Sequence, residues 1–379
     1  MGLAVATALS SFDQGGNRED LSDVLATIMA QDNETTLNLV GIKGAAKATT
    51  HTWVEDELSS YQSAAAEELA SAETDLDVYA GDGVKFRIGT LFKFANEPEV
   101  MQVTAITTDT LTIVRGYGST VDPGVAIPTL SVIEIISHPV QEDTDPINWE
   151  SIIRATAFNK TQVFYKTLKV SDTQEAVDKA GVSSEVSYQT EKKMIELMRE
   201  MNRTLICGIR SADAGSDTSY RSMGGIIEYV SAAGGNYLDA ATTDLTETML
   251  LNLLQQVYED GGNPDTVVAP AFQKRQISGF WKEYVRVGGG ETKIGTKVST
   301  YECDFGTVSV ILERHMPKDA ILVIDKARVA VMPLDGLSMG IQDLARTGRA
   351  QRKQLDGEYT CEIRNALKAH GYYYNLTTS

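Results

Sequence analysis

The sequence has only three cysteines, four histidines and no long apolar run. Cys207, Cys303 and Cys361 lie far apart and form no CxxC pair, which argues against a disulfide framework or a zinc site. None of the histidines has a His or Cys partner at helical spacing, so we predict no metal, no cofactor and no catalytic residue. No segment approaches the roughly 18 apolar residues of a membrane span, and Met1–Ser10 lacks the basic start of a signal peptide. We therefore expect no membrane contact and no secretion.

Positive charge is scarce in the first part of the chain. The net charge is −18, and residues 1–150 contain 7 Lys and Arg against 24 Asp and Glu, whereas residues 151–379 contain 27 against 28. Proteins that bind nucleic acid strongly present a basic field to the phosphates. The composition therefore predicts no more than weak, non-specific contact with DNA.

The chain has the composition of a large globular protein and one long helical segment. Its 379 residues are 42% hydrophobic and 23% charged, which is enough to bury cores in two or three units. Over Ser183–Cys207 the spacing of the apolar residues predicts a helix about 35 Å long with one narrow apolar stripe and charged remaining faces. That stripe consists of Met194, Leu197, Met198, Met201 and Leu205.

Shorter elements are predicted before residue 76. Residues 1–16 form an arm, and Arg18–Ala30 has the apolar spacing of a short amphipathic helix. Residues 48–61, around Trp53, are β-prone and predict an extended strand that leaves the body. Residues 62–75 are rich in Ala, Glu and Ser and are interpreted as a linker or a weak helix.

Residues 76–138 lose helical periodicity and predict a small barrel or sandwich of short strands. Met101–Ile106 and Leu111–Arg115 flank Thr107–Thr110, which we interpret as a hairpin with a four-residue loop. Val132–Ile136 is a further strand.

The flanks of this β-rich segment predict that it is an insertion. Trp149–Val170, which includes Phe164, returns to long, extended chain and is expected to pair with the strand around Trp53. The β-rich module then sits at the tip of a long hairpin and is dispensable for the fold of the subunit.

Residues 222–335 predict an α+β unit with two helices, one capped by Thr246 and one opened by Pro270. Its strands are Asp265–Ala269, Lys297–Cys303, Thr307–Glu313, Ile321–Ile324 and Arg328–Met332.

The last part of the chain, Ile341–Leu376, combines a basic patch with a strand, Glu358–Arg364. Alternation along the strand predicts that Tyr359, Cys361 and Ile363 are buried under the long helix and that Thr360, Glu362 and Arg364 face solvent. The basic patch either touches nucleic-acid phosphate or pairs with the acidic arm of another copy of the chain; we favour the second, because the complementary charge exists in the chain. The patch consists of Arg346, Arg349, Arg352 and Lys353.

Several short segments, in this order along the chain, together resemble a family of tailed-bacteriophage major capsid proteins. No single segment is specific, but the series covers nearly the whole chain. The segments are Asn17–Val24, the Trp53 strand, Ser171–Val177, Tyr188–Gln189, Met223–Gly225, Asp304–Thr307, Glu362–Asn365 and Ala369–His370.

The resemblance implies the α+β Hong Kong 97-type capsid fold and a structural, non-enzymatic role in the virion. It implies self-assembly through hexamers and pentamers into an icosahedral shell around a double-stranded DNA genome, inside the host bacterial cytoplasm. The implied partners are the chain itself, a portal, a separate scaffolding protein and, as an option, a decoration protein. The implied divisions are an N-terminal arm (1–47), an E-loop (48–170) carrying the insertion 76–138, a peripheral domain (171–221) with the spine helix 183–207, an axial domain (222–335) and a return to the peripheral sheet (336–379).

Two departures from the family pattern qualify what the resemblance implies. Capsid proteins that carry their own scaffold have a long helical leader before the arm, and here the arm begins almost at Met1, so we expect either a separate scaffold or a cleaved leader. The family's chainmail cross-link needs an E-loop lysine. Lys160, Lys166 and Lys169 lie near the corresponding segment, but no motif singles one out, so no cross-linking residue is assigned.

Other function classes remain open at this point. An intracellular enzyme needs converging polar groups, which the sequence does not offer, and a β-rich tail or adhesion protein would have β repeats throughout. Glu55, Asp56 and Glu57 suit a divalent cation, although a solvated charge run is the favoured interpretation.

Overall fold

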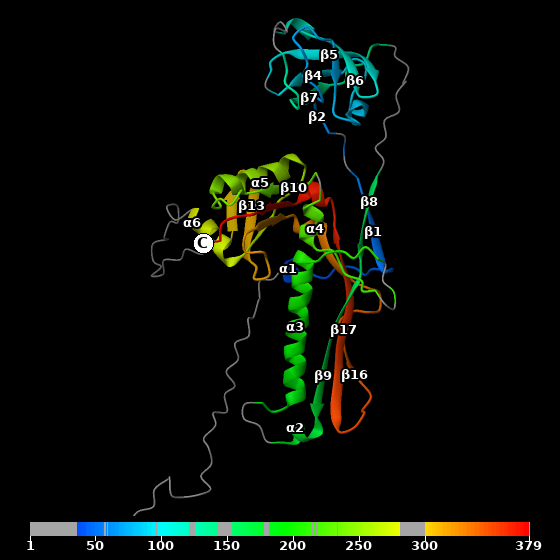
Figure 1. Cartoon of the computed structure of the whole chain (residues 1–379), viewed down its shortest axis with the longest axis vertical. Helices are drawn as coiled ribbons and strands as arrows, with labels where there is room; N and C mark the ends of the chain where they lie inside the picture. Colours follow the sequence, from blue (N-terminus) through cyan, green and yellow to red (C-terminus); the bar gives the residue numbers. More distant parts are fainter. Residues whose placement is uncertain are drawn as a thin grey trace, which may run out of the picture. The chain divides into compact units, whose positions relative to one another are not determined.

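The chain folds into two compact units, seen in the computed structural model (Figure 1). One unit, the body, comprises Met1–Trp53 with Thr156–Ser379, and the other, the module, comprises Val54–Ala155. The boundary falls within the paired strands β1 (Thr50–Glu55) and β8 (Ala155–Lys160), which we call the ribbon. The residues described are 36–56, 58, 60–95, 97–120, 126–142, 154–177, 182–213, 216, 219–232, 234–280 and 300–378, so the helix predicted at Arg18–Ala30 lies outside them.

The predicted long helix is present as α3, Glu185–Cys207. Ser184 caps it by accepting a hydrogen bond from Ser187 N, which satisfies one of the unpaired amides of the first turn. The short helix α2, Asp172–Ala176, precedes it and is capped by Ser171. Along the predicted apolar stripe of α3 the fully buried positions are Leu197, Met201 and Leu205.

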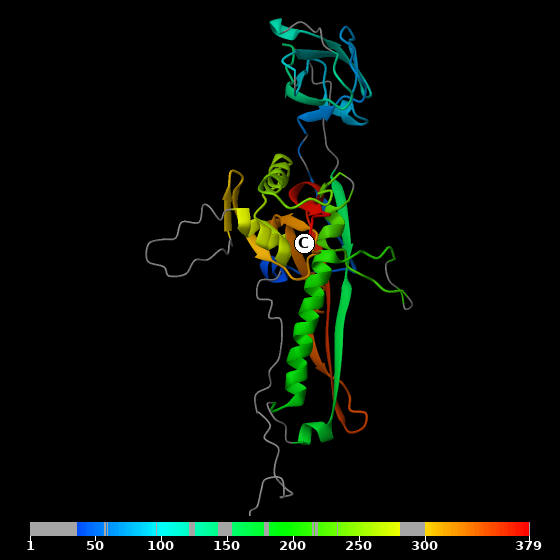
Figure 2. The same ribbon diagram turned by 60° about the vertical axis from the view of Figure 1, so that its left-hand side comes forward.

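That stripe of α3 covers one face of a four-stranded antiparallel sheet, as the prediction required (Figure 2). Phe164, Tyr359, Cys361 and Ile363 meet the helix there. The strands are β9 (Gln162–Ser171), β15 (Val329–Pro333), β16 (Gly340–Asp343) and β17 (Ala350–Ile363).

A six-stranded mixed sheet forms the rest of the body, in the order β10-β18-β14-β11-β13-β12. The predicted caps are confirmed: Thr246 accepts from Met249 N at the start of α5 (Glu247–Glu259), and α6 (Ala271–Phe280) follows Pro270. Both helices pack on the apolar core of this sheet. The strands are β10 (Asn236–Asp239), β11 (Thr266–Ala269), β12 (Thr300–Cys303), β13 (Gly306–Leu312), β14 (Ile321–Ile324) and β18 (Gly371–Tyr374); α4 (Ile226–Val230) and α7 (Ala366–Ala369) lie beside them.

The first described residues are held on the body by buried polar groups. Thr36 opens α1 (Thr36–Val40), and its backbone N–H and hydroxyl donate to the buried carboxylate of Glu313 at 3.0 and 3.1 Å. Leu37 N donates to Asn202 Oδ1 on α3 at 3.0 Å. These bonds fix the start of α1 on the body.

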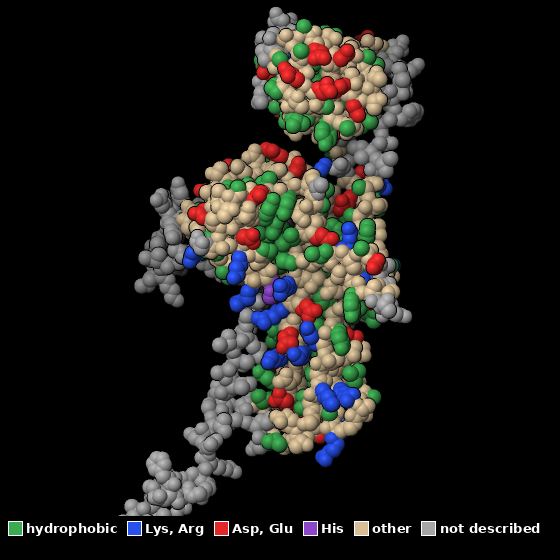
Figure 3. All heavy atoms as spheres, viewed as in Figure 1, with side chains coloured by type: hydrophobic (Ala, Val, Ile, Leu, Met, Phe, Trp, Pro, Cys, Tyr) green, Lys and Arg blue, Asp and Glu red, His purple; other side chains and the backbone are tan. Residues whose placement is uncertain are grey.

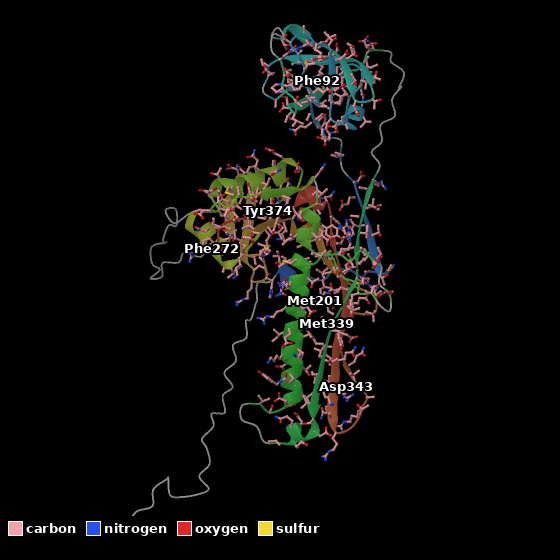
Figure 4. All side chains as sticks on the ribbon, in the orientation of Figure 1. Phe92, Met201, Phe272, Met339, Asp343 and Tyr374 are labelled. Carbon is pink, nitrogen blue, oxygen red and sulfur yellow. The ribbon has the colours of Figure 1, made fainter. Side chains whose placement is uncertain are left out.

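The module has a hydrophobic core of its own around one six-stranded sheet. The strands follow the order β2-β7-β4-β5-β6-β3 and enclose a cluster of large side chains that includes Phe92 (Figure 4). A separate core means that the module does not depend on the body for burial. The elements are β2 (Gln62–Ala64), β3 (Asp75–Asp77), η1 (Asp82–Lys85), β4 (Leu91–Phe94), β5 (Val100–Thr107), β6 (Thr110–Val114), η2 (Tyr117–Ser119) and β7 (Val132–Ser137).

The segment 62–75 is not the predicted linker or weak helix. β2 pairs with β7, and Ala65 and Leu69 belong to the module core. The Ala-rich composition misled the interpretation, because backbone pairing and burial override weak helix propensity. The β-rich unit thus begins before the predicted start at residue 76.

Two further details differ from the sequence predictions. The β5–β6 loop has two residues rather than four, because Thr108 adopts a left-handed φ of 56° and the Asp109 carboxylate accepts from Gly81 N and Gly83 N. Phe164 does not pair with the Trp53 strand. Its strand β9 pairs with β17, and the partner of β1 is the preceding strand, β8.

These boundaries predict how two deletions will differ. Replacing residues 61–140 with a short Gly-Ser turn removes the whole module core, so we expect a soluble body with native helix content by circular dichroism and native protease resistance. Replacing only residues 77–137 strands Ala65, Leu69 and Leu76 without their partners, and we expect that variant to aggregate. An insoluble 61–140 deletion, or a well-behaved 77–137 deletion, would show that the module is bounded differently.

Candidate functional site

A row of polar residues on β17 lies buried where the sequence predicted a solvated face. Glu358, Thr360 and Glu362 are 8%, 0% and 6% exposed, alternating with the apolar residues that face α3. The prediction was wrong for Thr360 and Glu362, because the far face of this part of β17 is covered by β8 and by the loop that follows α3, as the hydrogen bonds below establish; Arg364 is exposed, as predicted. This polar row is the candidate functional site of the body, because its residues bind the strands of the ribbon.

Asn159, on β8, is the centre of the arrangement and is fully buried. Its side-chain amide donates to Gly224 O at 3.0 Å and to Cys361 O at 2.8 Å, and its Oδ1 accepts from Gly224 N at 2.9 Å. One side chain thereby joins three segments that are far apart in sequence. The backbone approaches closely here: a Cβ on Gly225 would lie 2.6 Å from Gly208 N, so only glycine fits.

Two cations attach the loop after α3 to β8 and its end. Buried Lys160 donates from Nζ to Ala212 O at 2.7 Å and also to Asp213 O. Arg221 donates from Nε to Thr161 O at 2.7 Å and forms an ion pair with Glu358 on β17. Because these charges are largely removed from water, each needs its partners.

His51 and Arg364 hold the last polar residue of the row. His51 Nε2 lies 3.2 Å from Glu362 Oε2, and Arg364 Nε donates to Glu362 Oε1 at 2.5 Å. Burial by itself raises the pKa of the Glu362 carboxyl, but the hydrogen bonds and charges of Arg364 and His51 outweigh it, so the pKa lies below its usual value. The carboxylate is therefore ionised and ties β1 to β17.

Aromatic side chains complete the support of the ribbon. The Arg210 guanidinium lies 4.3 Å from the Phe158 ring centroid and donates to Phe158 O at 2.7 Å. Tyr229 donates from its hydroxyl to the same oxygen at 2.7 Å, and its ring centroid is 6.0 Å from that of Trp53. Burial raises the pKa of the Tyr229 hydroxyl, which stays protonated and remains a donor.

The polar residues of this site hold the ribbon on the body, and we call Asn159, Lys160, Arg221, Glu358 and Glu362 the anchor. Burial raises the pKa of the Cys361 thiol, which donates to Gly224 O at 3.0 Å and is protonated, so it is not poised as a nucleophile. Within the described residues, no group of three or more His, Cys, Asp or Glu side chains is arranged to hold a metal ion. The same residues include no helix with the length and apolar character needed to cross a membrane.

The three lysines considered for cross-linking occupy different environments. Lys160 is committed to the anchor, and Lys166 pairs with Glu200 on α3 at 2.6 Å. Lys169 is exposed on β9. Of the acidic run, Asp56 lies 3.5 Å from Arg154, and Glu57 is outside the described residues.

The basic patch is partly neutralised within the chain. Arg346 pairs with Asp172 at 2.9 Å and Lys353 with Asp343 at 3.3 Å. The structure does not bring Arg349 or Arg352 to a carboxylate among the described residues. The patch is thus smaller than the sequence suggested.

His370, beside the sheet of the body, is fully buried and neutral. Its Nδ1 accepts from Asp325 N at 3.2 Å. Burial, helped by the charge of Arg328, lowers the pKa of His370 to about 3. The buried ring holds the start of the turn at Asp325 through this hydrogen bond.

Comparison with known proteins gives one family match and several structural likenesses. The profile of the family described as SU10 major capsid protein matches residues 7–377. No curated protein matches the sequence.

The solved structures are similar in fold at low sequence identity. The capsid of an empty GTA particle has a TM-score of 0.53 at 9% identity, over 98% of this chain and 99% of that one. A chain from Mycobacterium phage Cain has a TM-score of 0.49 at 12% identity, over 98% and 100%. A chain from Microbacterium phage Oxtober96 has a TM-score of 0.49 at 10% identity, over 94% and 95%.

The anchor predicts a large effect of Asn159→Leu. The change leaves Gly224 N–H, Gly224 O and Cys361 O without their buried partner, and each unpaired group costs about 1–3 kcal/mol. We expect the free energy of unfolding of the body to fall by roughly 3 kcal/mol or more in denaturant titrations followed by tryptophan fluorescence. The control is Asn252→Leu on the exposed side of α5, and equal stability losses in the two variants would contradict the anchor.

His370 predicts a loss of stability in mild acid. Its folded pKa of about 3 lies below the unfolded value of about 6.5, so the unfolded chain binds the extra proton between these limits. Stability is therefore complete above about pH 6.5 and falls by up to about 1.4 kcal/mol per pH unit below it.

His370→Asn retains an acceptor for Asp325 N but does not titrate in this range. We expect a flatter dependence of the free energy of unfolding on pH between 7 and 4 than in the wild type. His138→Asn, in the module, is the comparison variant. If the free energy of unfolding of His370→Asn depends on pH as steeply as that of the wild type, His370 is not the group responsible.

Proposed function

The chain belongs to the SU10 major capsid protein family, and from this premise we propose that its copies assemble through hexamers and pentamers into an icosahedral shell around a tailed-phage double-stranded DNA genome. As a major capsid protein it is a structural component of the virion. Its α+β fold is that of the Hong Kong 97-type capsid proteins. The proposal contains no catalytic step.

The observation that carries the proposal is the ribbon. It joins two units that each have their own core, and the body fixes it through fully buried hydrogen bonds. A protein that acts as a monomer does not need a firmly held ribbon between its two units. A subunit that contacts its neighbours through both units does need one, because ordering a loosely held ribbon on assembly costs conformational entropy and weakens binding.

Exposed apolar side chains support assembly as well. Leu58, Val84 and Tyr220 are 93%, 82% and 95% exposed. Neighbouring subunits would cover such side chains in interfaces of about 1,200 Å² or more.

We assign the parts of the chain by the capsid plan. Residues 1–47 are the N-terminal arm, and 48–170 are the E-loop, with the inserted module extended at its start to β2. Residues 171–221 form the peripheral domain with α3 as the spine helix, 222–335 the axial domain, and 336–379 the return to the peripheral sheet.

Further partners follow from the same plan. The shell meets a portal at one vertex and forms around a separate scaffolding protein in the host bacterial cytoplasm, with a decoration protein as an optional addition. Packaged DNA makes only weak contact, since the chain carries a net charge of −18.

Assembly is the decisive test. The purified protein, alone or co-expressed with its phage scaffold, is expected to form closed shells visible by negative-stain microscopy and light scattering. Asn159→Leu, which loosens the ribbon, is expected to reduce the yield of shells, whereas Asn252→Leu is not. A protein that stays monomeric at every salt and protein concentration, with and without its scaffold, would refute the proposal.

A further inference from the structure

Two cations stand side by side on the face of the β9–β17 pair that points away from α3. Lys169 on β9 is the direct partner of Arg352 on β17 in the antiparallel register, which places both side chains on one face with their Cβ atoms about 5 Å apart. The residues that alternate with Lys169, Leu168 and Val170, are buried against α3. Figure 3 shows Lys and Arg side chains over the end of the sheet where β9 meets α2. Like charges directly opposite each other destabilise a pair of strands, so this pair has a cost in the isolated chain.

Neither of these cations has a neutralising partner in the part of the chain that the structure describes. Lys353, the residue after Arg352, pairs with Asp343 at 3.3 Å, but no described carboxylate lies within ion-pair distance of Lys169 or Arg352. The Arg352 guanidinium makes no hydrogen bond to the described residues, and its Nε is buried. A buried N–H group without an acceptor costs free energy. The pair therefore has donors and charge to offer to an anion.

The neighbouring register pair adds two neutral donors on the same face. Thr167 on β9 lies opposite Gln354 on β17, two residues along each strand from the two cations. Thr167 is exposed and Gln354 is half-buried, and a hydroxyl and a side-chain amide can each donate a hydrogen bond. We call the four residues of these two register pairs the oxyanion site: Lys169, Arg352, Thr167 and Gln354.

Two carboxylates lie farther along the same face and limit the extent of the site. Asp356 and Glu358 follow on β17 at two-residue steps. At about 3.3 Å per residue, Asp356 lies roughly 13 Å along the strand from Arg352, which exceeds the screening length of about 8 Å at physiological ionic strength. Glu358 is buried and forms an ion pair with Arg221. The positive region is therefore confined to the oxyanion site.

We propose that the oxyanion site binds one small tetrahedral oxyanion, of the class of inorganic phosphate and sulfate. The Lys169 ammonium and the Arg352 guanidinium donate charge-assisted hydrogen bonds to the anion, and a turn of the arginine side chain presents Nε with one Nη atom as a bidentate donor. Thr167 and Gln354 donate to the remaining oxygens. The bound anion lies between the two cations and removes their repulsion, so it holds β9 and β17 together more firmly. The site goes beyond the proposed function, because a single unassembled chain contains all of it.

The limited extent of the site favours a single anion over nucleic acid. A polyanion is bound by a basic field that follows many phosphates. Here two cations are followed on the same face by Asp356 and Glu358, which would repel the next phosphates of an extended backbone. Four donors within two register pairs instead match the oxygens of one tetrahedral anion.

The first test is thermal unfolding of the unassembled protein with phosphate as the probe. Circular dichroism of the helices reports the body, because the described α-helices all lie in it. With a Kd of roughly 1 mM, about 10 mM phosphate should raise the melting temperature by about 3 °C relative to sodium chloride of equal ionic strength. No rise in the wild-type protein overturns the proposal.

Lys169→Gln should have two effects of opposite sign. The change removes the repulsion, so the melting temperature in chloride should stay equal to that of the wild type or rise by about 1 °C. It also removes one ligand of the anion, so the response to phosphate should fall to less than about a third. A cation with a purely structural role would not separate these two readings.

The matched control is Lys192→Gln, which removes one exposed cation from α3 on the other side of the sheet. Its response to phosphate should equal that of the wild type. Phosphate also stabilises proteins weakly because it is excluded from their surfaces, and this part of the response is common to all three proteins. Equal responses in Lys169→Gln and Lys192→Gln overturn the proposal.

The second test locates the bound anion by hydrogen exchange and mass spectrometry. Phosphate should slow exchange roughly threefold or more in peptides from β9 and β17 of the wild type, and leave the peptides of β4 and β5 in the module unchanged. Protection that is absent from β9 and β17, or equal in Lys169→Gln, counts against the site. A short DNA duplex that protects these peptides more strongly than inorganic phosphate, at equal phosphate concentration, would assign the site to nucleic acid and overturn the proposal.

Discussion

The structure depends on the buried hydrogen bonds of one amide side chain, Asn159. A fully buried amide is costly unless its donors and acceptor are paired, and here the pairs come from the loop after α3 and from β17. Because all three segments must be in place to satisfy it, β8 has one position on the body. Lys160, Arg221 and Glu362 act on the same strands, so disturbing one segment exposes polar groups on the others.

This anchor explains why the two units can have separate cores. The module buries its apolar side chains in its own core, around Phe92, and none of the residues of that core belongs to the body. The body gains its burial under α3 and across the six-stranded sheet. What connects them is a two-stranded ribbon, and an isolated pair of strands is marginal in water. The contacts that support it lie at the body end, where His51, Trp53 and Asn159 are held.

The sequence predicted the elements well and the site poorly. The α3 stripe, the Thr246 cap and the strand Thr266–Ala269 follow from local periodicity and capping, which depend on neighbours in sequence. Burial of Thr360 and Glu362 depends on a strand and a loop that are distant in sequence, so alternation on β17 suggested a solvated face. The one available signal was the Met223–Gly225 glycine pair, which marks a close backbone approach but does not say to what.

The cations of the basic patch also differ in whether the fold gives them a carboxylate partner. Arg346 pairs with Asp172 at the start of α2, and Lys353 pairs with Asp343 on the neighbouring strand β16, so both charges have partners within the chain. Lys169 and Arg352 face each other in register; Lys169 is exposed, whereas Arg352 is half-buried and its Nε is buried without a hydrogen-bond partner among the described residues. Selection for the stability of a lone chain would remove such a pair, since it costs folding free energy. The pair lies on the sheet face away from α3, and the Asp356 carboxylate on that face lies opposite Tyr165 and not beside the two cations, so the register itself leaves the repulsion in place.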